Sequence, residues 1–270
     1  MVENQGIEIY FEDTGAGPPL VLGHSFLCSG TMWRQQLPAL AGDYRVINPD
    51  LRGHGRSGHA TAPFSLYDAV EDVVAVLDGL EIERAVWCGL SIGGMIALRA
   101  ALTHPDRVGG LILMDTDAGR ESVLRALKYR AMGLGVRAVG LGPFIPAVAR
   151  LMFGSTTRRE NPAIVDDWKA QVRSMHVPSA LRGLEALLER DSLLERLEEI
   201  DVPALVVVGE EDRSLPPALS RQIHERLPGS TLRVIPRAGH LSSLERPQAV
   251  NAALLEFLGQ HAGGESTART

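Results

Sequence analysis

A serine between two glycines, at the point where an apolar run gives way to strong helix formers, constrains this chain more than any other feature. Residues 85–88 are apolar, with β-branched and aromatic members, and predict a short buried strand, whereas residues 95–102 predict a helix. Between them, residues 89–93 have the form G-x-S-x-G. A strand that turns at once into a helix strains its turn residue and leaves room only for glycine beside it. We therefore expect Ser91 to project its hydroxyl above a sheet and Ile92, at the helix start, to point an unpaired N–H toward any developing anion.

Further apolar runs alternate with helical segments on both sides of this serine. Such alternation predicts an α/β fold, in which a mostly parallel central sheet carries helices on both faces. Ligands collect at the carboxyl ends of parallel strands, so Ser91, Phe26 and Asp115 should lie at one edge. The predicted strands are residues 20–23, 44–50, 85–88, 108–115, 202–209 and 232–235, with an edge strand at 7–12.

A helix is predicted after residue 65, because apolar side chains then recur at helical spacing. Ser65 and Asp68 have the spacing of a capping box at its start. The acids Glu71, Asp72 and Asp78 are expected on its solvated face.

Strand patterns are absent from residues 119–200, where helical segments follow one another. We predict helices at 123–139, 146–152, 164–175 and 179–197. Apolar residues of this region are candidates for lining a pocket, although most are expected to hold the helices together. The candidates are Met132, Leu134, Leu141, Phe144, Ile145, Met152, Phe153, Trp168 and Met175. Residues 262–270, rich in Gly, Ser and Thr, are predicted to be disordered.

Four motifs, taken together, resemble the α/β-hydrolase fold family. They are the G-x-S-x-G turn, the run Asp-x-Arg-Gly-x-Gly-x-Ser at 50–57, the pattern Gly-x-x-Asp at 209–212 with a following proline, and Ala-Gly-His-x-x-x-x-Glu-x-Pro at 238–247. The chain looks most like the serine-nucleophile branch that contains carboxylesterases, 3-oxoadipate enol-lactonases and cofactor-free haloperoxidases. The second motif is a structural loop in this family, and Asp50 and Arg52 are expected to pair and hold its turn.

The resemblance implies roles for particular residues. Ser91 would be the nucleophile, Asp212 the acid and His240 the base, in the chain order of the family. Of the three neighbouring acids, Glu210 and Glu211 are expected to be loop and surface charges. The resemblance also implies that residues 119–200 form a helical cap inserted into a core made of residues 1–118 and 201–261.

The family's oxyanion hole would be formed by the backbone amides of Phe26 and Ile92. The chain departs from the commonest family pattern by having Ser25 where glycine follows the histidine, as some enol-lactonase-like members do. His24, at a strand end, is expected to fix this loop by hydrogen bonding rather than to act as the base.

These residue types fit nucleophilic catalysis. A serine hydroxyl needs a neutral imidazole to take its proton, and the imidazole needs a carboxylate to hold its tautomer. We predict a serine hydrolase that cleaves a small-to-medium carboxylic ester or lactone through an acyl-enzyme. Two alternatives stay open: a carbon–carbon bond hydrolase acting on a β-diketone-like ring-cleavage product, and a ligand-sensing protein with slow turnover.

Composition narrows the partners. The net charge of −6, with scattered basic residues, predicts neither nucleic acid nor an anionic membrane as the main partner, and no apolar run is long enough to span a bilayer. A cytoplasmic location is therefore expected, and the two cysteines, Cys28 and Cys88, fit a reduced compartment. The eight histidines are dispersed and Cys-x-x-Cys is missing, so no metal site is predicted, nor any cofactor. The sequence leaves the oligomeric state open.

Overall fold

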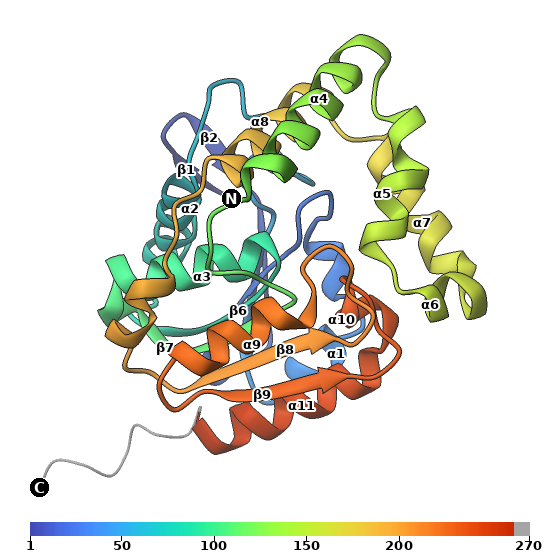
Figure 1. Ribbon diagram of the computed structural model, residues 1–270. Coiled ribbons are helices and arrows are strands. Elements are labelled where there is room, and N and C mark those ends of the chain that lie inside the picture. Colours follow the sequence, from blue (N-terminus) through green and yellow to red (C-terminus); the bar gives the residue numbers. More distant parts are fainter. Residues whose placement is uncertain (262–270) are drawn as a thin grey trace, which may run out of the picture.

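In the computed structural model, which describes residues 1–261, the chain folds around a seven-stranded sheet (Figure 1). The strand order is β3-β5-β4-β6-β7-β8-β9, and every neighbouring pair except β3 with β5 runs parallel. The strands are β3 (Phe11–Thr14), β4 (Pro19–Gly23), β5 (Arg45–Pro49), β6 (Ala85–Leu90), β7 (Val108–Met114), β8 (Ala204–Gly209) and β9 (Thr231–Ile235). The predicted α/β class with a mostly parallel sheet is confirmed.

Helices cover both faces of this sheet, so successive side chains of its central strands enter two separate hydrophobic cores. In β6, for example, Trp87 packs in one core and Cys88 in the other. The first core is completed by α2 (Leu66–Gly79), α3 (Ile92–Thr103) and α9 (Pro217–Arg226). The second is completed by the 3-10 turn η1 (Gly30–Trp33), α1 (Leu37–Leu40) and α11 (Pro247–His261). Cys28 and Cys88 are both free and buried.

The chain between β7 and β8 forms five α-helices, which we call the inserted helices. They lie beyond the sheet edge at which β8 and β9 end (Figure 1). They are α4 (Val123–Val139), α5 (Ile145–Met152), α6 (Ser155–Glu160), α7 (Pro162–Arg173) and α8 (Val177–Leu188), with 3-10 turns η3 (Gly142–Phe144) and η4 (Leu194–Glu199). The division into a core and a cap domain stays a prediction.

Two features of the inserted helices differ from the expectation. The short α6 has no counterpart among the predicted helices, and α7 begins directly after it because Pro162 occupies the first turn, where a missing N–H costs nothing. The last predicted helix, 179–197, is divided into α8 and η4 by residues 189–193.

The N-terminal edge strand predicted at 7–12 is also divided in two. β2 (Ile7–Ile9) pairs with β1 (Val2–Asn4) in a small antiparallel sheet, whereas β3 pairs with β5 in the large one. Between them, Tyr10 donates its N–H to the hydroxyl of Ser57, so the ladder is broken at this residue. Between β4 and β5, the chain forms a 3-10 turn followed by the four-residue α1.

Helix α2 starts as predicted, with the complete capping box of Ser65 and Asp68. The expectation for Asp72 is wrong, because its carboxylate is buried and holds the guanidinium of Arg52 at 2.5 and 2.7 Å. The expected pairing of Arg52 with Asp50 is therefore replaced by a contact with the helix. Asp50 instead accepts the backbone N–H groups of Gly30 and Arg56.

The predicted disordered tail, residues 262–270, lies outside the described residues. Within residues 1–261, no helix combines the length and the apolar character needed to cross a bilayer.

Candidate active site

Four neighbouring strands, β6 to β9, end at one edge of the sheet, and each delivers a polar side chain there. Ser91 directly follows β6 and Asp115 directly follows β7, whereas Asp212 lies three residues beyond β8 and His240 five residues beyond β9. All four residues are buried. These loops are far apart in the sequence, and it is the order of the strands in the sheet that brings them together.

Ser91 occupies a strained turn, as the pattern of residues 89–93 predicts. Its backbone has φ 57° and ψ −115°, a conformation uncommon for a residue with a side chain. Two hydrogen bonds hold it, since its N–H donates to the carbonyl of Met114 (2.8 Å) and its carbonyl accepts the hydroxyl of Thr116 (2.7 Å). A Cβ on Gly89 would lie 2.1 Å from the carbonyl carbon of Gly93, so only glycine permits this close approach.

His240 and Asp212 form a buried pair. The Nδ1 of His240 lies 2.8 Å from Oδ2 of Asp212. The other oxygen, Oδ1, accepts the N–H groups of Ser214 (2.8 Å) and Leu215 (2.9 Å), so the carboxylate is fixed on both sides. A carboxylate only accepts hydrogen bonds, so in the neutral ring Nδ1 carries the proton and Nε2 keeps its lone pair.

The electrostatic surroundings of His240 favour its protonated form. Burial opposes a charge on the ring, but the attraction and hydrogen bond of Asp212, assisted by Asp115 and Glu245, outweigh it and raise the pKa of His240 above its usual 6.5. This imidazole is therefore a stronger base than a free histidine side chain.

Two buried carboxyl groups that the sequence did not assign hold the loop of His240. Glu245 accepts the N–H groups of Gly239 and Gly154, both at 2.9 Å, and so ties this loop to the inserted helices. Asp115 accepts the N–H of Gly209 and the hydroxyl of Ser242. Burial, followed by repulsion from the carboxylate of Asp212, raises the pKa of Asp115 well above its usual value. Glu245 was visible in the sequence as part of the histidine motif, whereas nothing local signalled a positioning role for Asp115.

The two predicted oxyanion amides lie on adjacent loops. Gly23 of β4 is in register with Gly89 of β6, and Phe26 and Ile92 each follow three residues later. The loops are pressed together, since a Cβ on Gly93 would lie 2.3 Å from the carbonyl oxygen of Gly23. Ile92 is the first residue of α3, so its N–H receives no acceptor from the helix ladder.

His24 has the structural role expected of it. Its Nε2 accepts the N–H of Leu51 (2.9 Å) and its Nδ1 lies 2.8 Å from the carbonyl of Ser25. Burial lowers its pKa to about 4, so the ring stays neutral and holds the loop that carries Phe26.

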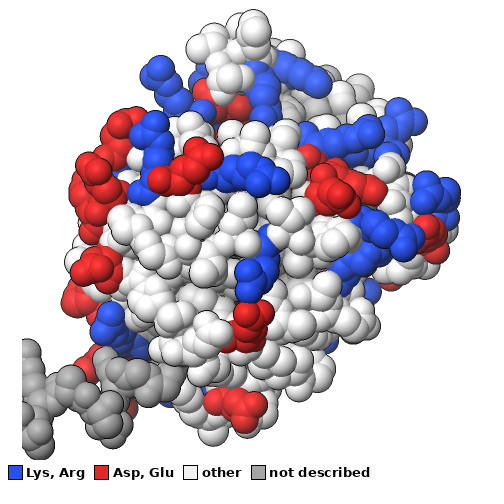
Figure 2. Space-filling model, turned by 60° about the horizontal axis from the view of Figure 1, so that its bottom comes forward, with Lys and Arg blue, Asp and Glu red and all other residues white. Residues whose placement is uncertain are grey.

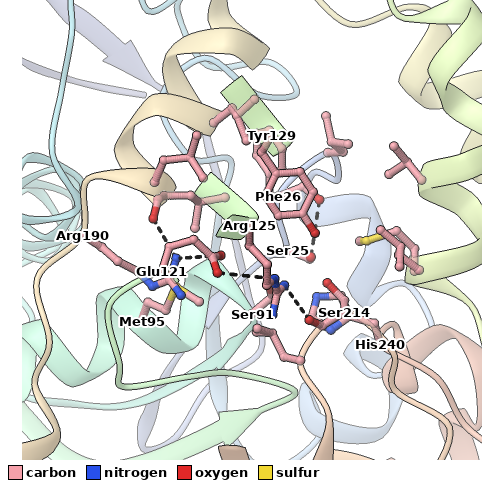
Figure 3. A pocket seen from close by; sticks show the side chains of 18 of the residues that line it. Ser25, Phe26, Ser91, Met95, Glu121, Arg125, Tyr129, Arg190, Ser214 and His240 are labelled. Atoms are coloured by element: carbon pink, nitrogen blue, oxygen red, sulfur yellow. Dashed lines mark hydrogen bonds and ion pairs between the residues drawn. The ribbon is translucent and has the colours of Figure 1, made fainter. Parts of the chain in front are cut away.

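A cavity of about 740 Å³ lies between the sheet edge and the inserted helices, and both Ser91 and His240 line it (Figure 3). Most of its wall is apolar. The apolar lining residues are Phe26, Leu27, Met95, Met132, Val148, Leu151, Met152, Leu184, Leu187, Leu188 and Leu215. A second apolar cavity of about 430 Å³ shares part of this wall, including Phe26 and Met132.

The candidate pocket residues of the sequence fall into different places. Met132 and Met152 line the cavity beside Ser91, whereas Leu141, Phe144 and Ile145 line the second cavity. Four others line neither of these two cavities. Phe153 and Trp168 pack edge to face in the core, and Leu134 is exposed to solvent. Met175 lines a separate hollow beside His176.

A polar cluster in the cavity wall was not anticipated from the sequence. Arg125 of α4 reaches down beside the loop of Ser214, donates to the carbonyl of that residue (2.8 Å), and lies 3.3 Å from Glu121 (Figure 3). Glu121 also contacts the buried Arg190, which is paired with Asp117 at 3.1 Å. The cluster joins α4 to the core beside the nucleophile candidate. Among residues 1–261, no three His, Cys, Asp or Glu side chains converge in a way that would hold a metal ion.

Comparison with known proteins gives consistent results. A family model described as "alpha/beta hydrolase fold" matches residues 18–247. The chain is similar to 3-oxoadipate enol-lactonase 2 of Acinetobacter baylyi, with 32% identity over 88% of this chain and 87% of the relative. It is also similar to the structure of a thermophilic esterase from Thermogutta terrifontis, with a TM-score of 0.90, 32% identity and coverage of 96% of both chains. An enol-lactonase structure from Burkholderia xenovorans matches with a TM-score of 0.89, 28% identity and coverage of 94% and 98%.

Proposed function

The chain belongs to the α/β-hydrolase fold family, and from this premise we propose that it is a serine hydrolase that cleaves a small-to-medium carboxylic ester or lactone. Hydrolase activity on esters, lactones or related substrates agrees with the names of its relatives, which include an enol-lactonase and an esterase. The observation that carries the proposal is the buried hydrogen bond between His240 and Asp212, because His240 lines the same cavity as Ser91.

In the proposed mechanism, the Oγ of Ser91 attacks the carbonyl carbon while Nε2 of His240 accepts its proton. Asp212 keeps the proton of the neutral ring on Nδ1 and stabilises the imidazolium that forms. The amides of Phe26 and Ile92 bind the oxyanion, and one such donor is worth about 3 kcal/mol in the transition state. His240 then protonates the leaving alcohol, which leaves an acyl-enzyme on Ser91. A water molecule, deprotonated by His240, releases the acid.

The cavity supports the proposed substrate class. Its largely apolar wall suits a hydrocarbon acyl or alcohol part. We also propose that residues 119–200 act as a cap, because α4, α5 and α8 each contribute side chains to this wall. The cytoplasmic location stays a prediction from the sequence.

The test is the release of p-nitrophenol from p-nitrophenyl esters of increasing acyl length. The wild-type protein should turn over many times, with the preferred length reporting the size of the pocket, and Ser91→Ala should be inactive although folded. Ser220→Ala is the matched control, because Ser220 is a buried serine of α9 outside the cavity wall.

Two results would contradict the proposal. A Ser91→Ala protein with wild-type turnover would exclude Ser91 as the nucleophile. A single burst of one equivalent, with the acyl group trapped on Ser91 in the mass spectrum, would favour the ligand-sensing alternative. Inert but folded wild-type protein would direct the search to lactones and to ring-cleavage diketones.

A further inference from the structure

Helix α4 has an exposed apolar stripe in addition to the side that packs on the protein. Within residues 1–261, five of the eight large hydrophobic side chains that are exposed belong to this helix. Leu124 is 82% exposed, and Leu134 is 67% exposed. At 3.6 residues per turn, the exposed apolar residues Val123, Leu124, Leu127, Ala131, Leu134 and Ala138 fall within an arc of about 100°. The stripe runs the length of the helix.

The opposite side of α4 explains why the helix is held in place without this stripe. Ala126, Gly133 and Val136 are buried there, and α4 packs against α8. Met132 and Arg125 face the cavity. The outer stripe therefore contributes nothing to the fold of the described chain, and its exposure to water is unfavourable in an isolated monomer.

Cations border the stripe on both sides. The helix carries Arg125, Lys128, Arg130 and Arg137 and no carboxylate, although the whole chain has a net charge of −6. Lys128 lies beside one margin of the stripe, and Arg130 and Arg137 lie beside the other. Arg130 lies 3.9 Å from Glu189, directly after α8, and Arg137 lies 3.0 Å from Glu185 of α8, but both arginine side chains stay more than half exposed. In Figure 2, Lys and Arg are interspersed with Asp and Glu over the upper part of the molecule, and the lower part carries few charges.

We propose that this stripe docks the protein on an anionic lipid surface. An amphipathic helix of this kind lies in the plane of the interface, with its leucines at the boundary of the acyl chains and its cations among anionic headgroups. A second copy of the chain is a poorer fit, because packing two such stripes together would bring Lys128, Arg130 and Arg137 of one copy against the same cations of the other. The negative net charge predicted no membrane partner, and the proposal depends instead on the local distribution of charge.

Docking would also bring the cavity to the lipid surface. The two faces of one helix are separated by about 10 Å, so the side chains of α4 that line the cavity would lie about that far from the interface. The proposal concerns binding and stands independently of hydrolysis, because its readout is the fraction of protein bound to vesicles.

The experiment is co-sedimentation of the full-length protein with vesicles of phosphatidylcholine, with and without phosphatidylglycerol, at low and high salt. We expect binding to the anionic vesicles at low salt and its loss at high salt. The triple variant Leu124→Gln, Leu127→Gln and Leu134→Gln should lose binding, and Lys128→Glu should weaken it about fivefold or more. These side chains are exposed, so the variants should fold.

The matched control is Leu255→Gln, which replaces an exposed leucine of α11 outside the stripe and should bind like the wild type. Ser91→Ala should also bind normally. The proposal is overturned if the protein does not bind anionic vesicles or if it binds neutral vesicles equally well. It is also overturned if analytical ultracentrifugation shows a dimer that the triple variant abolishes.

Discussion

The substitution Asp212→Asn tests the proposed catalytic pair most sharply, because the structure fixes how the asparagine must lie. Two backbone N–H groups, those of Ser214 and Leu215, point at Oδ1. Only the amide oxygen of asparagine can accept them, so its NH2 group must take the place of Oδ2 opposite Nδ1 of His240. Two donors would then face each other unless the imidazole moves its proton to Nε2.

The magnitude follows from that tautomer. With the proton on Nε2, His240 has no lone pair facing Ser91 and cannot act as the general base. The loss expected for a wrong tautomer in a serine triad is about 10,000-fold in kcat, or about 5 kcal/mol of transition-state stabilisation. The substitution changes the shape of the side chain very little, so the folded structure should persist.

The assay compares kcat for a p-nitrophenyl ester in the wild type, in Asp212→Asn and in Glu211→Gln. Glu211 is the neighbouring carboxylate, and it binds Ser155 and Thr156 of the inserted helices instead of His240. Glu211→Gln should stay close to the wild type. An Asp212→Asn protein within about tenfold of the wild-type kcat would refute the reasoning, since the tautomer would then be immaterial.

Two further predictions concern the pH profile and the stability of the fold. Only neutral His240 can accept a proton, and the pKa of this residue is raised, so kcat/KM should fall as the pH decreases through an apparent pKa above 6.5. A pH–rate profile in which kcat/KM falls with an apparent pKa below 6.5 would contradict the assigned surroundings of His240. Removing Asp72 leaves the buried guanidinium of Arg52 without its carboxylate partner, so Asp72→Ala should lower the free energy of unfolding, measured with urea, by about 3–5 kcal/mol. Asp78 lies on the same helix, but its carboxylate is exposed, so Asp78→Ala should lower the free energy of unfolding by at most about 1 kcal/mol. Equal losses for the two variants would show that burial is not the cause.

The elements that could be predicted from the sequence are those whose cause is local. Residues 89–93 specify the turn of Ser91 by sterics alone, and the capping box of Ser65 and Asp68 involves neighbours on one turn of a helix. The central strands could be predicted because a parallel sheet buried on both faces requires continuous apolar runs. The proposed catalytic residues could also be named from the sequence, since Ser91, Asp212 and His240 each follow a strand in a recognisable motif.

The features that only the tertiary structure decided depend on which surfaces meet. Asp72 was expected in water because its helix reads as amphipathic, yet the loop of Arg52 covers that position and makes a buried ion pair. Asp115 looks like any residue at the end of a strand until the loop of Ser242 packs on it.

The wall of the cavity and the outer stripe of α4 show the same division. The sequence predicted a helix at residues 123–139, but because this helix has apolar residues on two sides, its sequence leaves open which side faces the protein. Packing against α8 settled that choice, directed Arg125 toward Ser214, and left Leu124 and Leu134 in solvent. The sequence by itself determined the proposed catalytic residue types and the order of the elements, because these follow from local sterics and apolar pattern. Contacts between segments distant in the chain decided which single charges are buried and which side of a helix faces the protein.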